Sequence, residues 1–136
     1  MIESYSQNVT VLADSAIPFN STSIQKGCTS IKSGTTTFEL NKCGVYMVSF
    51  DVSVIATEIG EISIQLRKDG VLQPQAITEV TAADTTSIHP LSFVTLVQVK
   101  DNNSCKCCDG GVTIEIVNTG VGITASQANV VITKIC

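Results

Sequence analysis

The chain has no tryptophan, only 4% aromatic residues and a single histidine among its 136 residues. It is also poor in basic residues, with eight Lys and Arg against twelve Asp and Glu and a net charge of −4. Binding to nucleic acid needs clustered Lys and Arg, so this scattered set argues against a nucleic-acid partner. No apolar run reaches the roughly 20 residues of a membrane-spanning helix, so we expect no membrane span.

Cysteine, by contrast, is abundant for a chain of this size. Six cysteines in a small protein favour an oxidising destination, yet the first residues lack the basic and apolar regions of a secretory signal peptide. A protein made in a host cytoplasm and released by lysis, as virion and spore-surface proteins are, would satisfy both observations. The six residues are Cys28, Cys43, Cys105, Cys107, Cys108 and Cys136.

Apolar and polar residues alternate with a period of two from end to end, and no segment keeps a helical period. The clearest predicted strand spans 45–55, and a weaker one at 71–80 contains Pro74, which an edge strand would tolerate. Ala82–His89 is predicted to be a loop. The remaining strands are expected at 8–13, 24–31, 35–40, 62–66, 91–100, 112–118 and 128–135.

Roughly nine short strands joined by polar turns predict an all-β protein, either a sandwich or a barrel. We expect a single domain over 1–136, in which 1–7 are a short N-terminal lead-in or attachment segment. If consecutive strands run antiparallel, the turn at Cys43, the loop at 105–108 and the C-terminal Cys136 lie at the same end of the molecule.

Several segments resemble a known family, the trimeric jelly-roll heads related to complement globular heads and tumour necrosis factor (TNF). The similarity covers about residues 8–136. Within this family the chain most resembles the C-terminal domains of collagen-like exosporium proteins and head-fibre-type proteins of phages that infect gut Clostridia, although it lacks a Gly-X-Y collagen stalk. The segments that carry the resemblance are 17–20 (IPFN), 41–46 (NKCGVY), 64–66 (IQL), 69–71 (DGV) and 128–135 (ANVVITKI).

The resemblance implies a jelly-roll β-sandwich that forms a homotrimer, with both chain ends near one base. The end that holds the cysteines would then be the base by which the trimer attaches.

The cysteines have three interpretations. They would form disulfides within or between subunits, or bind zinc, or remain free structural or redox thiols. Cys105 and Cys108 have the C-x-x-C spacing of a zinc knuckle, which Cys43 and Cys136 would complete. Without that zinc ion we expect no cofactor.

Catalysis has little support in the sequence. His89 is not accompanied by the signature of a serine or cysteine nucleophile. Carboxylate pairs are conceivable at Glu58 with Glu61, or at Glu79 with Asp84, but the simpler interpretation is solvated loop charge.

We therefore predict a non-enzymatic structural surface protein, most specifically a phage capsid decoration or head-fibre trimer on the virion surface. Its cysteine-rich base would fasten it to a capsid or other surface-layer protein, and its distal loops would meet a host glycan or protein. The alternatives are a spore-surface or appendage subunit crosslinked by disulfides, and a carbohydrate-binding adhesion module. Residues expected in the core or a subunit interface are Tyr46, Val48, Phe50, Ile64, Leu66, Phe93, Ile114 and Ile132.

Overall fold

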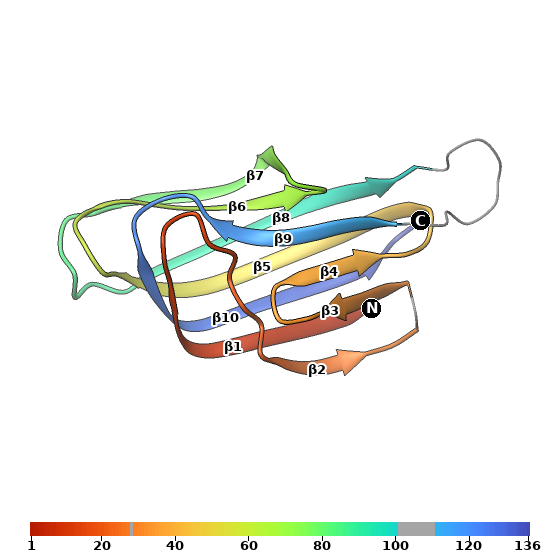
Figure 1. The fold of residues 1–136 in the computed structure, drawn as a ribbon, viewed down its shortest axis with the longest axis horizontal. Helices are drawn as coiled ribbons and strands as arrows, with labels where there is room; N and C mark the ends of the chain where they lie inside the picture. The colour runs from red at the N-terminus through yellow and green to blue at the C-terminus, as the bar shows by residue number, and fades with distance from the viewer. Residues whose placement is uncertain (28, 101–110) are drawn as a thin grey trace.

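The computed structural model describes residues 1–27, 29–100 and 111–136. Over these ranges the chain forms ten strands in two five-stranded antiparallel sheets that pack face to face (Figure 1). Sheet A has the order β2-β1-β10-β5-β8, and sheet B has the order β3-β4-β9-β6-β7. The strands are β1 (Ile2–Val11), β2 (Ser21–Gln25), β3 (Ser30–Ser33), β4 (Thr37–Leu40), β5 (Gly44–Ala56), β6 (Gly60–Lys68), β7 (Val71–Ala82), β8 (His89–Val99), β9 (Val112–Asn118) and β10 (Ile123–Lys134).

The two packed antiparallel sheets are the all-β sandwich that the sequence predicts. Strands far apart in the sequence pair within each sheet, for example β1 with β10 and β5 with β8. The described residues contain no helix long and apolar enough to cross a membrane.

The core lies between the two sheets and is filled by the inward-facing half of each alternating strand. Along β5, burial alternates residue by residue over most of the strand, because successive side chains of a strand point to opposite faces. All eight residues named above for the core or an interface are buried, with exposed fractions between 0 and 8%. Phe19 packs edge-on against Phe38 and Phe50 and joins the two layers.

Three segments differ from the sequence-based expectation. The strand expected over 24–31 is wrong as a single element, because the chain forms β2 in sheet A and β3 in sheet B. The break contains Gly27, whose φ of +73° turns the backbone. Residues 2–7, expected to be a lead-in, form the first part of β1 and pair with β10. The last strand begins at Ile123 instead of 128.

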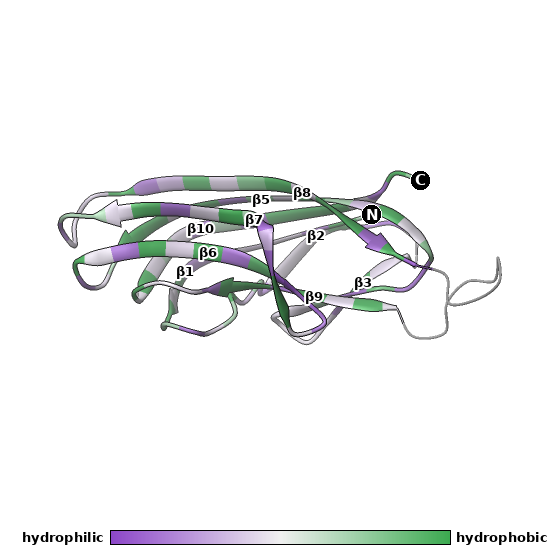
Figure 2. Cartoon of the chain, turned by 90° about the horizontal axis from the view of Figure 1, so that it is seen from above, coloured by the Kyte–Doolittle hydropathy of each residue, from purple (hydrophilic) through white to green (hydrophobic). Residues whose placement is uncertain are grey.

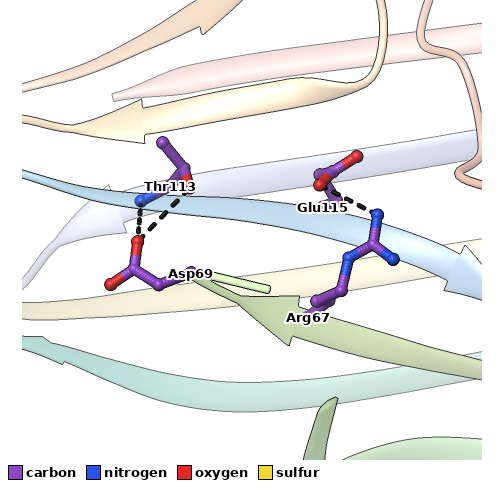
Figure 3. Close-up of polar contacts among 4 residues, drawn as sticks. All are labelled: Arg67, Asp69, Thr113 and Glu115. Carbon is purple, nitrogen blue, oxygen red and sulfur yellow. Dashed lines mark hydrogen bonds and ion pairs between the residues drawn. The ribbon is translucent and has the colours of Figure 1, made fainter. Parts of the chain in front are cut away.

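The β6–β7 connection is the tight hairpin that the Asp-Gly sequence predicts. Asp69 and Gly70 both have positive φ, at 49° and 83°. The Asp69 carboxylate accepts a hydrogen bond of 2.9 Å from the Thr113 amide, and Arg67 forms an ion pair of 3.0 Å with Glu115 (Figure 3). These contacts attach the hairpin to β9. The following strand β7 carries Pro74 at the edge of sheet B, as predicted.

Candidate functional site

Both chain termini and the segments that flank the cysteines meet at one end of the sandwich, here called the terminal end (Figure 1). Gly44 pairs with Val99 on β8. The Ile135 amide donates to the Val45 carbonyl oxygen over 2.8 Å. Gly111 packs so closely that an added Cβ would lie 1.7 Å from the Leu40 carbonyl oxygen. Cys43, Cys136 and both flanks of the 101–110 segment therefore come to one end, as strand parity predicts.

The neighbours of Cys28 lie at the same end. The Thr29 carbonyl oxygen accepts a hydrogen bond of 2.8 Å from the Asn41 amide. On the other side, the Lys26 carbonyl oxygen accepts a hydrogen bond of 2.7 Å from the N-terminal amine of Met1.

Only two of the six cysteines are among the described residues. Cys136 is a free, exposed thiol, whereas Cys43 is disulfide-bonded. Because a disulfide sulfur is not a thiolate, Cys43 in this state does not supply a zinc ligand. The described ranges contain no group of three or more His, Cys, Asp or Glu side chains placed to hold a metal ion. The predictions that involve Cys28, Cys105, Cys107 and Cys108 fall outside the described residues.

The opposite end, here called the distal end, is formed by the loops 12–15, 57–59, 83–88 and 119–122. The Thr57 amide donates to the Gly122 carbonyl oxygen over 2.9 Å, and the Val121 amide donates to the Glu61 carbonyl oxygen over 2.9 Å. His89, which follows the third loop, pairs with Val54 near the same end of β5. The Asp14 amide donates to the Asn118 carbonyl oxygen over 2.8 Å, so all four loops lie at this end of the sandwich.

Two carboxylates meet at the distal end, but not in either of the pairs suggested by the sequence. Glu61 and Glu79 are diagonal neighbours on the outer face of β6 and β7, since Ser63 pairs with Glu79 and Glu61 with Thr81. A hydrogen bond with Glu61 and repulsion from its charge raise the pKa of Glu79. An open hollow of about 460 Å³ lies beside them and is also lined by Glu58. The pair could not be predicted from the sequence, because Glu61 and Glu79 become neighbours only through the register of the β6–β7 hairpin.

Asp84 is used within its own loop and is separate from this pair. Its carboxylate accepts hydrogen bonds from the Ser87 amide at 2.7 Å and the Thr86 amide at 3.0 Å. Because these bonds favour the charged form, they lower the pKa of Asp84. Asp84 therefore acts as a local anchor for the 83–88 loop.

His89 was expected at the end of a loop but is the first residue of β8, two positions before the expected start of that strand at 91. Its Nε2 atom is buried and has no hydrogen-bond partner among the described residues. A catalytic dyad requires a nucleophile within hydrogen-bond reach of the base, and no described residue supplies one at this nitrogen.

The outer face of sheet A carries exposed apolar side chains. Residues aligned across the strands form three rows that contain only two charged side chains, Glu3 and Asp51. Val94 and Leu96 on β8 are 63% and 56% exposed, and the hydropathy of the residues along this strand is coloured in Figure 2. The rows are Leu96–Met47–Thr133, Val94–Ser49–Val131–Glu3 and Ser92–Asp51–Asn129–Tyr5.

This outer face also contains a shallow hollow of about 330 Å³ around the third row. Asp51, Ser92 and Asn129 line it with polar atoms. Such an open and mixed surface fits a protein contact better than a pocket for a small molecule, which is usually enclosed and mostly apolar.

Asn118 is a structural residue that the sequence did not single out. It is fully buried, and its Nδ2 lies 3.2 Å from the Val11 carbonyl oxygen, 3.3 Å from that of Leu12 and 2.9 Å from that of Val121. Its Oδ1 accepts a hydrogen bond of 3.0 Å from the Gly120 amide. The only sequence feature that could have indicated its role is the Asn-Thr-Gly turn at 118–120.

No family model and no curated protein matches the chain. Solved structures do match in fold. The chain is similar to Eiger TNF from S. frugiperda with a TM-score of 0.70 and 12% identity, over 99% of this chain and 92% of that one. It is also similar to murine APRIL with a TM-score of 0.67 and 7% identity, over 98% of both chains.

A phage protein is among the structures with the same fold. The PRD1 vertex protein P5 matches with a TM-score of 0.59 and 14% identity, over 99% of this chain and 96% of that one. At these identities the comparisons define a fold, and that fold is the TNF-like jelly roll.

Proposed function

We propose that the chain is a non-enzymatic structural protein that forms a homotrimer through the outer face of sheet A. The observation that carries this proposal is the exposure of the large apolar side chains of Val94 and Leu96 within these three rows. Complete burial of a Val or Leu side chain stabilises by roughly 1.5–3 kcal/mol, so several copies of such a face would supply substantial association energy. A closed ring of subunits also covers the exposed edge of β8, which would otherwise invite unwanted strand pairing.

The mass of the protein in solution tests the trimer. Light scattering after gel filtration should give three times 14.3 kDa for the wild-type chain. The double substitution Val94→Glu and Leu96→Glu should give a monomer that keeps its β-sheet circular dichroism, because the charges lie on exposed positions. Ile59→Glu at the distal end is the matched control and should remain trimeric. A monomeric wild type, or a double variant that stays trimeric, would contradict the proposal.

The more specific proposal is a phage capsid decoration or head-fibre head that resides on the virion surface. It is supported by the shared fold of a phage vertex protein. The terminal end would be the fastened base, which is supported by the position of both termini there. Mass spectrometry of purified phage particles should detect the chain in stoichiometric amounts. Detection in purified spores, with absence from particles, would favour the spore-surface alternative.

The exposed thiol of Cys136 specifically favours a second candidate, a spore or appendage subunit crosslinked by disulfides. Non-reducing electrophoresis of native material separates the two. A discrete trimer band supports a head, whereas a high ladder that collapses on reduction supports a crosslinked filament. A carbohydrate-binding module is less well supported, because five of the six aromatic rings are buried and Tyr5 alone is exposed for stacking, at 36%.

A further inference from the structure

Three loops of the distal end each expose one large aliphatic side chain. Leu12, Ile59 and Ile88 are 68, 70 and 62% exposed. They lie in the 12–15, 57–59 and 83–88 loops, which the backbone contacts described above hold at the same end of the sandwich. Apolar side chains gathered at one end of a protein are typical of an interaction surface, whereas single exposed ones are unremarkable.

The charge at this end has one sign. Five carboxylates lie in the distal loops or on the strands beside them: Asp14, Glu58, Glu61, Glu79 and Asp84. None of the seven Lys and Arg residues among the described residues lies in these loops or lines the hollow beside Glu61. The described basic residues lie instead toward the terminal end, as Lys26 beside Met1 and Lys68 beside Gln98 illustrate.

Hydrogen bonds from Asn118 and within the 83–88 loop hold the distal loops in place. Asn118 contacts the carbonyl oxygens of Leu12 and Val121, and Asp84 accepts two amide hydrogen bonds within its own loop. Since a surface that is already ordered loses less entropy when it binds, these anchors make the distal end a better docking surface than mobile loops would be.

We propose that the distal end docks a polypeptide surface on which apolar side chains are flanked by Lys or Arg. The exposed aliphatic tips supply apolar contact, and the surrounding carboxylates select a cationic partner and accelerate its approach. The same charges repel nucleic acid and anionic lipid. The inference rests on the proposed function only in taking this end as the one that faces outward.

Binding of a defined peptide to the intact chain tests the proposal. The probe is a 14-residue amphipathic peptide of Leu and Lys, compared with a Leu and Glu peptide and with a Ser and Lys peptide of the same length. Titration calorimetry should detect binding of the Leu and Lys peptide that weakens as salt is added. The other two peptides should bind at least tenfold more weakly.

The variants locate the contact. Ile59→Ser with Ile88→Ser, and separately Glu58→Gln with Glu61→Gln, should each weaken binding at least tenfold. Val71→Ser is the matched apolar control, since Val71 is 63% exposed on β7 outside the distal loops, and Glu39→Gln is the matched charge control. Both controls should change the affinity less than twofold.

Equal losses of peptide affinity in the control and distal variants would overturn the proposal. So would binding of the Leu and Glu peptide, preferential binding to anionic phosphatidylserine vesicles, or binding of none of the peptides. The mass of each sample is measured in parallel. If the chain is a monomer that still binds the Leu and Lys peptide through the distal loops, the trimer is contradicted and the docking surface stands. If the chain is a trimer that binds no peptide, the docking surface is contradicted and the trimer stands.

Discussion

At the scale of single residues, the buried side-chain amide of Asn118 links the loop between β1 and β2 to the loop between β9 and β10. Its side-chain amide lies within hydrogen-bond distance of the carbonyl oxygens of Val11, Leu12 and Val121 at the rim of the core. Buried polar groups of this kind are expensive to leave unpaired. One side chain thus helps to hold two distal loops together.

We predict that Asn118→Ala destabilises the fold by about 3 kcal/mol, because several buried groups lose their partner at once. Thr119→Val is the control. Its hydroxyl donates one half-buried hydrogen bond to Ser63, and its loss should cost about 1 kcal/mol. Urea denaturation at constant m-value measures both. Equal effects of the two substitutions would show that Asn118 is not the anchor described here.

The 83–88 loop should respond to acid through Asp84. The folded state lowers the pKa of this carboxyl below its ordinary value of 3.8. Its contribution to loop stability is therefore complete above that value and is lost as the pH falls through the lower folded pKa. The carboxyl carbon resonance of Asp84 should titrate below its midpoint in the urea-unfolded chain, and Ser87→Ala should raise the folded midpoint. A folded midpoint at or above the unfolded one would contradict this assignment.

At the scale of elements, strands with apolar inward positions were predictable and strands with polar ones were not. The 112–118 strand has the predicted bounds. The start of β1 was missed because its inward positions after Ile2 are Ser4 and Ser6, which are buried although polar. Ser6 is satisfied by donating to the Pro18 carbonyl oxygen and accepting from the Asn20 amide. Those partners lie in a loop that the alternation pattern does not reveal.

Substitution of Ile2 distinguishes a strand from a lead-in segment. Ile2 is fully buried, so Ile2→Ala should destabilise by about 3 kcal/mol through lost burial and the remaining cavity. Ile24→Ala makes the same chemical change on β2, where the side chain is 38% exposed, and should cost about 1 kcal/mol or less. Thermal unfolding of both variants provides the comparison. If Ile2→Ala left the stability unchanged, residues 1–7 would be better described as an attachment segment than as part of a core strand.

At the scale of the whole molecule, connectivity was predictable and surface chemistry was not. Counting antiparallel strands was enough to bring Cys43 and Cys136 to one end, because that argument needs only the direction of each strand. The acidic distal end could not be predicted in the same way. Glu61 and Glu79 meet through hairpin register, and Leu12 joins Ile59 only after distant loops pack together.

The shared position of the two termini has a practical consequence for engineering. Met1 contacts Lys26, and Ile135 contacts Val45, all at the terminal end. A tag or cargo fused to either terminus would therefore leave from the same side of the molecule, away from the distal loops. Peptides grafted into the exposed 83–88 loop would be presented on the opposite side, so one small scaffold could carry a tether and an epitope without steric conflict.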